Sequence, residues 1–250
     1  MIFDFIKNIV LNFFFPKRCL SCGEEGNFVC ENCLKKISFL QNQQCPQCRR
    51  KNLIGNFCKK KCQNLYNFDQ LIVSCHYEKT ALIKKIITAF KYRFLRELRT
   101  LLAIVLKTQF IYLSQFINFE ENVVFVPVPI HKKRLGYRGF NQSAELAKEL
   151  LTLLKTDEDF SRKFANIKFS DCLIRTRYLH KQASLHRSER LQNLTDSINF
   201  SPSCSEQIKG KLCVLIDDVA TTCTTLNECS KVLKQNGATY VCGLVLARGI

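Results

Sequence analysis

The sequence predicts an α/β protein in which a mostly parallel sheet, with helices on both of its faces, follows a small cysteine-rich module. The first indication is that apolar, β-branched segments alternate with segments of helical periodicity. We expect strands at residues 71–77, 123–129, 212–217 and 239–247, and helices at residues 81–92, 95–113, 139–154 and 225–235. Such alternation is typical of parallel strands joined by helical crossovers. The second indication is that eight of the 15 cysteines lie between Cys19 and Cys62, in closely spaced pairs.

These two patterns divide the 250 residues into two domains. Residues 1–66 are expected to form an N-terminal helix and the cysteine-rich module, and residues 67–250 the α/β domain. The first segment is apolar at helical spacing, but it contains charged side chains and ends at Pro16, which leaves it too short to span a bilayer. We expect this helix to pack on the protein rather than on a membrane surface. Residues 156–170 and 199–209 are expected to be loops.

Charge and cysteine usage narrow the classes of partner and compartment. A net charge of +17 favours polyanionic partners, because Lys and Arg gain most from neutralising phosphates; solubility alone is the alternative. The chain opens without the cationic and apolar regions of a signal peptide. We therefore expect a reducing, cytoplasmic compartment in which the cysteines form no disulfides.

The cysteines of the N-terminal module form four pairs with the spacing of metal ligands. A spacer of two residues lets both thiolates of a pair face one tetrahedral zinc ion, and two pairs complete a closed structural site. Such a short segment needs metal ligation for much of its folding free energy. We expect two zinc ions; neighbouring pairs sharing a metal is the simplest of three pairings, and a cross-braced arrangement is another. The module either binds a partner or nucleic acid, or only caps the main domain. The eight ligands are Cys19, Cys22, Cys30, Cys33, Cys45, Cys48, Cys58 and Cys62.

A second candidate site follows the apolar segment at residues 212–216. Two acids come next, and then a loop of small hydroxyl residues that enters a helix. Backbone N–H groups and the dipole at a helix start attract phosphate, and such loops bind ligands in doubly wound sheets. The carboxylates can accept hydrogen bonds from ribose hydroxyls or hold water on Mg²⁺. As surface groups, they are expected to contribute no more than ~1 kcal/mol to stability. The expected ligand-binding residues are Asp217, Asp218, Thr221, Thr222, Cys223, Thr224 and Thr225.

This stretch resembles the motif of type I phosphoribosyltransferases that binds 5-phosphoribosyl-1-pyrophosphate (PRPP), and the whole chain resembles the ComF family of competence proteins. The family's VPVP and RGFNQ segments correspond to residues 126–129 and 138–142. Further matching residues are Lys91, Tyr92, Arg177, Gln182, Leu185, Arg190, Asn193, Phe200, Leu246, Ala247 and Arg248. The resemblance implies a double zinc ribbon before a type I phosphoribosyltransferase-like domain, with PRPP and Mg²⁺ as ligands. It also implies a role in natural transformation, handling single-stranded DNA in the cytoplasm or at the inner face of the membrane.

One position departs from the family's pattern. Cys223 stands where the family usually has Gly, which would permit a positive φ and close approach of a phosphate. The side chain of Cys223 could point away from a phosphate if the loop stays in the right-handed conformation. A reactive thiol, activated by the helix start, is the alternative.

Two basic segments flank the expected ligand site. In the related transferases the loop that corresponds to Lys132, Lys133 and Arg134 approaches pyrophosphate, and DNA phosphates could bind there equally well. Residues 175–190 are expected to form a mobile hood over the site. Tyr137 and Tyr178 are placed where bases could stack, whereas Phe140 is expected in the core. The expected nucleic-acid contacts are Lys132, Lys133, Arg134, Arg138, Arg177, Lys181, Arg187 and Arg190.

Three functions remain open at this point. The first is a DNA-uptake protein whose transferase fold retains PRPP binding and also binds single-stranded DNA. The second is an active phosphoribosyltransferase on a small base or amine; no catalytic residue is assigned, because such transfer depends on positioning rather than on a protein nucleophile. The third is a zinc-ribbon adaptor that docks to a helicase or a membrane channel and keeps a vestigial pocket.

Overall fold

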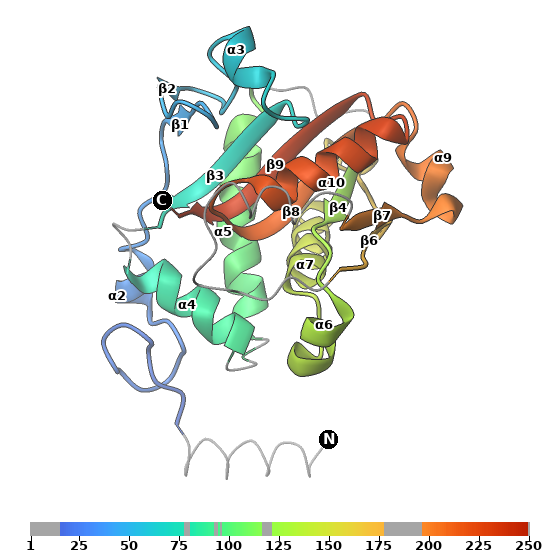
Figure 1. Ribbon diagram of the computed structural model, residues 1–250. Coiled ribbons are helices and arrows are strands. Elements are labelled where there is room, and N and C mark those ends of the chain that lie inside the picture. The colour runs from blue at the N-terminus through green and yellow to red at the C-terminus, as the bar shows by residue number, and fades with distance from the viewer. Residues whose placement is uncertain are drawn as a thin grey trace, which may run out of the picture.

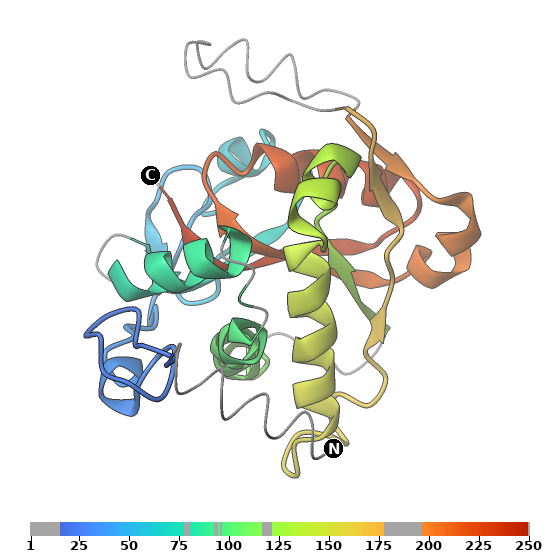
Figure 2. The same cartoon turned by 90° about the horizontal axis from the view of Figure 1, so that it is seen from below.

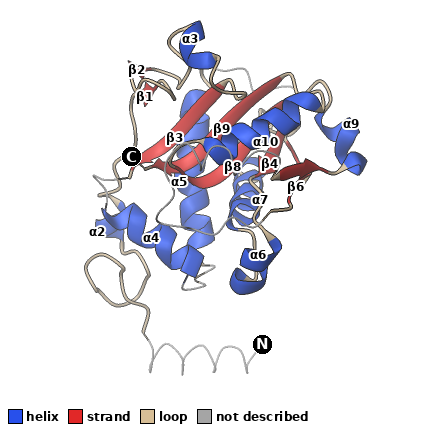
Figure 3. Ribbon diagram, in the orientation of Figure 1, coloured by secondary structure: helices blue, strands red, loops and turns tan. Residues whose placement is uncertain are grey.

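A five-stranded parallel sheet forms the centre of the protein (Figures 1 and 3). The computed structural model describes residues 16–77, 81–92, 95, 97–116, 122–177 and 197–249. The strand order is β3-β9-β8-β4-β5, and every neighbouring pair is parallel. The strands are β3 (Gln70–His76), β9 (Tyr240–Arg248), β8 (Leu212–Ala220), β4 (Val123–Pro127) and β5 (Lys168–Phe169). The predicted α/β class with a parallel sheet is confirmed.

Helices cover both faces of this sheet, as Figure 2 shows from below. On one face lie α4 (Ala81–Tyr92), α5 (Leu98–Leu113) and α7 (Gln142–Lys155). On the other lies α10 (Thr224–Gln235), beside an antiparallel hairpin of β6 (Leu173–Arg175) and β7 (Ile198–Phe200). The strands read as continuous apolar runs because each face packs against one of two hydrophobic clusters.

Several segments expected to be loops contain regular structure. Residues 132–138 form the helix α6 (Lys132–Arg138), which ends at Gly139 in the left-handed conformation. The expected loop at 156–170 contains β5, and the one at 199–209 contains the end of β7, a 3₁₀ turn (Pro202–Cys204) and α9 (Ser205–Ile208). These elements are too short for periodicity to reveal. Residues 1–15 and 178–196, which carry the expected N-terminal helix and most of the expected hood, lie outside the described residues.

The cysteine-rich module is built from short elements: α2 (Glu31–Leu34), β1 (Gln43–Gln44), β2 (Lys51–Asn52) and α3 (Lys60–Gln63). Its second half docks on β3. The buried amide of Gln43 donates to the carbonyl of Val73 at 3.0 Å and accepts from its N–H at 2.8 Å. Gly55 has φ +79°, and any side chain there would collide with the carbonyl of Leu71. The described residues contain no helix with the length and apolar character needed to cross a membrane.

Candidate functional sites

The eight cysteines of the module gather into two groups of four. Within each group all sulfur atoms lie within 4.8 Å of one another. The Sγ atoms of Cys22 and Cys30 are 3.6 Å apart, and those of Cys58 and Cys62 are 3.7 Å apart. Zinc–sulfur bonds of about 2.3 Å in a tetrahedron place sulfurs ~3.8 Å apart, so four thiolates at this spacing fit one zinc ion. The groups are Cys19, Cys22, Cys30, Cys33 and Cys45, Cys48, Cys58, Cys62, which is the sequential pairing.

Both groups are built in the same way from a tight turn and a short helix. In the first turn the N–H of Gly23 donates to the carbonyl of Cys19 at 2.9 Å, and in the second the N–H of Arg49 donates to that of Cys45 at 3.1 Å. Of the other two thiols of each group, one lies within the helix, Cys33 in α2 and Cys62 in α3. The other comes just before it: Cys30 is the N-cap of α2, and Cys58 precedes Lys59, the N-cap of α3. These sulfur–sulfur distances exceed the ~2.05 Å of a disulfide, so the cysteines stand as metal ligands rather than as bridges.

The phosphate loop, residues 221–225, lies where neighbouring strands send the chain to opposite faces of the sheet. β4 and β8 are adjacent and parallel. The chain leaves β4 towards α7 on one face and leaves β8 towards α10 on the other. This places the loop at a switch point of the sheet, the usual position of the ligand crevice in open α/β sheets.

The two acids lie inside β8 rather than after it, because this strand continues to Ala220. The Asp218 side chain is buried, with 3% of the residue exposed, and its Oδ1 pairs with Nζ of Lys91 at 2.7 Å. Its Oδ2 is buried and has no hydrogen-bond partner among the residues that the structure describes. The expectation that both acids are surface groups is thus wrong for Asp218.

Asp217 occupies a different environment. Its Oδ1 accepts hydrogen bonds of 2.9 Å from the hydroxyl of Ser143, at the start of α7, and from the N–H of Asp218. Burial, and then the negative charge of Asp218, hold the pKa of Asp217 well above its usual range. Arg175 of β6 is also close: burial and the charge of Arg134 lower the pKa of Arg175, and Asp217 opposes this.

The loop after β8 exposes Thr221 and Thr222 at the start of α10. The hydroxyls of Thr222 and Thr224 are 2.7 Å apart and share a hydrogen bond. Cys223 has φ +61°, so the loop does not stay in the right-handed conformation here, and the residue takes the backbone form that glycine would favour. Its side chain is 3% exposed, and burial raises the pKa of the thiol, which contradicts the alternative of a reactive thiol.

The basic residues after β4 divide into two kinds. Lys132 and Lys133 are exposed on α6, which begins at His131, whose Nδ1 accepts from the N–H of Lys133 at 3.2 Å. Arg138 is only 6% exposed; its guanidinium donates to Oε1 of Gln142 at 2.9 Å and lies over the ring of Tyr92. Its assignment as a nucleic-acid contact is therefore wrong, because those internal contacts hold it in the core.

The other expected contacts are placed as follows. Arg177 is exposed at the last described position before residue 178, and Lys181, Arg187 and Arg190 lie outside the described residues, as does Tyr178. Tyr137 is 69% exposed. Phe140 is buried, with its ring centroid 5.3 Å from that of Phe90, so its expected place in the core is confirmed.

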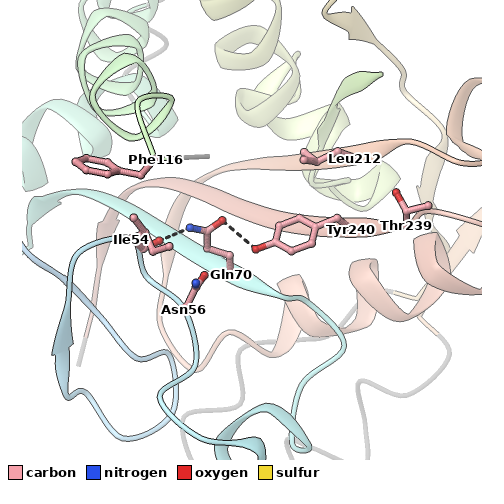
Figure 4. Close-up of a pocket in the computed structure, with 7 residues that line it drawn as sticks. All are labelled: Ile54, Asn56, Gln70, Phe116, Leu212, Thr239 and Tyr240. Atoms are coloured by element: carbon pink, nitrogen blue, oxygen red, sulfur yellow. Dashed lines mark hydrogen bonds between the residues drawn. The ribbon is translucent and has the colours of Figure 1, made fainter. Parts of the chain in front are cut away.

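A pocket of about 420 Å³ lies at the opposite end of the sheet (Figure 4). Its lining includes the first residues of three strands, Gln70, Leu212 and Tyr240. Since the strands are parallel, this pocket is at their amino ends, away from the phosphate loop. The Gln70 side chain bridges it by donating to the carbonyl of Ile54 and accepting from Tyr240 at 3.2 Å.

Sequence reasoning missed three side chains of the ligand crevice: the partners Ser143 and Lys91, and Arg175 as a neighbour of Asp217. In the sequence, Lys91 stands out only as part of the family's pattern. All three lie more than 40 residues from Asp217, and no local signal links such positions. One signal could have pointed to Ser143. Its segment follows β4, and the carboxyl ends of parallel strands meet at one edge of the sheet, so residues after β4 are expected near those after β8.

Comparisons with known proteins agree with the zinc-binding module and with the resemblance of the whole chain to competence proteins. Residues 10–64 match the double zinc ribbon domain family. The chain is 26% identical over 247 residues to Competence protein F of Haemophilus influenzae, which covers 94% of this chain and 98% of that protein. It is 26% identical over 214 residues to Competence protein ComFC of Bacillus subtilis, covering 84% and 79% of the two chains. A stretch of 68 residues is 38% identical to Ribose-phosphate pyrophosphokinase B of Dictyostelium discoideum, covering 25% of this chain and 21% of that protein.

Proposed function

Because this chain belongs to the ComF family of competence proteins, we propose that it acts in DNA uptake in the cytoplasm, as a protein that binds both a ribose phosphate and single-stranded DNA. The ribose phosphate, PRPP or a close relative, occupies the crevice between β4 and β8. The two four-cysteine groups hold structural zinc ions in a module of residues 1–66, and residues 67–250 form the ligand-binding domain.

The observation that carries the ribose-phosphate proposal is the acid pair that precedes the phosphate loop at the switch point of the sheet. Asp217 is fixed by Ser143, and Asp218 by Lys91. Carboxylates held in this way are preorganised to accept hydrogen bonds from ribose hydroxyls. The N–H groups at the start of α10 and the exposed hydroxyls of Thr221 and Thr222 face the place of the phosphate.

Magnesium has a supporting part in this proposal. Among the described residues, groups of three or more metal-binding side chains are formed only by the cysteines. The unpartnered Oδ2 of Asp218 fits a role towards a metal-bound water, but two carboxylates do not complete a site. Magnesium would therefore arrive with the pyrophosphate of PRPP, where it neutralises negative charge.

Single-stranded DNA binding is supported by α6 at the rim of this crevice. Lys132 and Lys133 are exposed there, Arg134 is partly exposed, and the exposed ring of Tyr137 follows within one turn. A basic surface with an aromatic side chain tracks the backbone of a single strand and stacks its bases without sequence preference. The net charge of +17 acts in the same direction.

Calorimetric titration with PRPP and Mg²⁺ tests the ribose-phosphate site. The doubly substituted variant Thr222→Val/Thr224→Val keeps the shape of the loop and removes both hydroxyl donors. Each lost hydrogen bond is worth about 1 kcal/mol, so we expect a fall in affinity of about tenfold or more.

The matched control is Thr152→Val, on the exposed side of α7, where the hydroxyl only donates to the carbonyl of Lys148. It should bind PRPP like the parent. Absence of PRPP binding by the parent, or equal binding by the loop variant, would refute the assignment of this crevice. Release of pyrophosphate from PRPP in the presence of a small acceptor would favour the alternative that the protein is an active phosphoribosyltransferase.

A further inference from the structure

The second cysteine group is packed against the phosphate loop rather than set apart from it. The N–H of Asn67, just after this group, donates to Oδ1 of Asn227 in the first turns of α10 at 2.6 Å. The hydroxyl of Tyr66 donates to Oε1 of Gln47, inside the cysteine turn, at 2.9 Å. In Figure 1 the module and the end of β9 lie at the same side of the sheet.

Arg248 joins the turn to the loop. It is the last residue of β9 and is paired with Ala220, the residue before the phosphate loop. Its Nη2 donates to the carbonyl of Pro46, between Cys45 and Cys48. Among the described residues its buried Nε has no nitrogen or oxygen partner, and the side chain forms a hydrogen bond with the thiol of Cys223. The guanidinium therefore lies between the metal-binding turn and the loop.

Arg49, in the same turn, has an unfavourable backbone. It has φ +63°, whereas the equivalent position of the first cysteine group is Gly23, with φ +83°. A left-handed conformation costs a residue with a side chain about 1–2 kcal/mol, so an arginine is kept here at some expense to stability. Such strain is most often retained at functional positions.

Both arginines act on the loop. Arg248 contacts the carbonyl of Pro46 and is paired with Ala220, and Arg49 belongs to the same cysteine turn as Pro46, so the turn brings both residues to the side of the loop. In agreement with this, burial raises the pKa of the Cys223 thiol, and the charges of Arg248 and Arg49 and a hydrogen bond from Arg248 oppose the rise. Within the described part of the chain neither arginine forms an ion pair. Two unneutralised guanidinium groups and the positive end of α10 thus meet at one place, which favours an anion there.

We propose that the second zinc-binding turn forms one wall of the ribose-phosphate site, where Arg49 and Arg248 bind the phosphate group held by residues 221–225. This inference rests on the proposed ribose-phosphate binding and adds the module to it. The zinc ion then holds Arg49 at the loop, and the module is a working part of the ligand site rather than a cap.

The test is the variant Arg49→Gly, titrated with ribose 5-phosphate and with PRPP and Mg²⁺. Glycine relieves the left-handed backbone and reproduces the first cysteine turn, so the zinc content and the urea midpoint should stay at or above those of the parent. The lost charge-assisted contact should weaken both ligands about tenfold or more. Arg49→Asn, which also tolerates positive φ, should behave in the same way.

The matched control is Arg50→Ala, which removes the same charge from the neighbouring position and should bind both ligands like the parent. Equal affinities of the parent and both Arg49 variants would overturn this inference and leave the ribose-phosphate proposal intact. A parent that binds neither ligand would overturn both. If the Arg49 variants lost affinity for single-stranded DNA alone, the inference would also be overturned, since Arg49 would then bind the nucleic acid instead of the phosphate.

Discussion

Replacing the two adjacent acids of β8 by asparagine should change stability in opposite directions. In the folded protein the ionised form of Asp217 is destabilised, because burial and the charge of Asp218 raise its pKa. In Asp217→Asn the neutral amide keeps an oxygen for Ser143 and for the N–H of Asp218 and removes the repulsion. Since one pKa unit corresponds to 1.36 kcal/mol, a gain of about 1 to 2 kcal/mol at pH 7 is expected.

Asp218→Asn should do the reverse. It leaves Nζ of Lys91, which is 18% exposed, without its counter-ion. A hydrogen bond between charged groups at such a site contributes about 1.5 to 3 kcal/mol, so a loss of about 2 kcal/mol is expected. The exposed Asp159→Asn variant removes the same charge elsewhere and should change stability by less than ~0.5 kcal/mol.

The pH dependence of the stability gain in Asp217→Asn shows whether the raised pKa of Asp217 causes it or only the change in net charge. A carboxyl whose pKa is raised on folding binds more protons in the folded state, so its contribution to stability is complete below the unfolded pKa of about 4 and is lost as the pH rises through the raised value. The advantage of Asp217→Asn should therefore be small near pH 4 and grow towards pH 7. Urea unfolding across this range measures it. Two variants that shift the midpoint in the same direction, or an advantage independent of pH, would refute the reasoning.

Three further outcomes are expected. Protein purified without added metal should contain two zinc ions per chain by elemental analysis, and one ion would contradict the second site. Cys223→Gly should change the free energy of unfolding by less than ~1 kcal/mol, because relief of the left-handed backbone offsets the lost burial of one side chain; ribose-phosphate affinity should hold or rise, and a sharp fall would reveal a role for the thiol. Single-stranded DNA affinity should fall with salt at ~0.7 log units per phosphate neutralised, and the slope should become shallower in Lys132→Ala/Lys133→Ala/Arg134→Ala. DNA binding by this variant that equals the parent's at every salt concentration would remove α6 from the interface.

Four of the five strands of the main sheet, β3, β4, β8 and β9, were predictable because each carries its own signal. The helix expected at residues 81–92 is α4 with the same bounds, and β3, β9 and α10 differ from expectation by one residue at most ends. Continuous apolar runs and helical periodicity are local properties, so a single sequence reveals them. The cysteine groups were predictable for the same reason, since ligand spacing is a local consequence of tetrahedral geometry.

The contacts of the candidate site could not be found in this way. Whether Arg138 faces solvent or the core depends on Tyr92, 46 positions away, and a cation at a helix end looks the same in both cases. The helix α6 escaped notice because its seven residues, Lys132–Arg138, are mostly basic and its stop signal, Gly139, was assigned to the following helix. The left-handed conformation of Cys223 breaks the usual preference of its residue type, and only the fold around the loop imposes it.

The extent of β8 decides how its two acids differ. A strand that continues to Ala220 fixes the backbone of both acids, so each carboxylate is held at its own partner. One is drawn to Lys91 of α4 and becomes a buried ion pair, and the other faces Ser143 and the neighbourhood of Arg175. Had the strand ended before the acids, a flexible turn would have left both in water. In the proposed site Asp218 is therefore held by Lys91, whereas Asp217 keeps a raised pKa, and a bound ribose hydroxyl or a cation beside it would favour its ionised form.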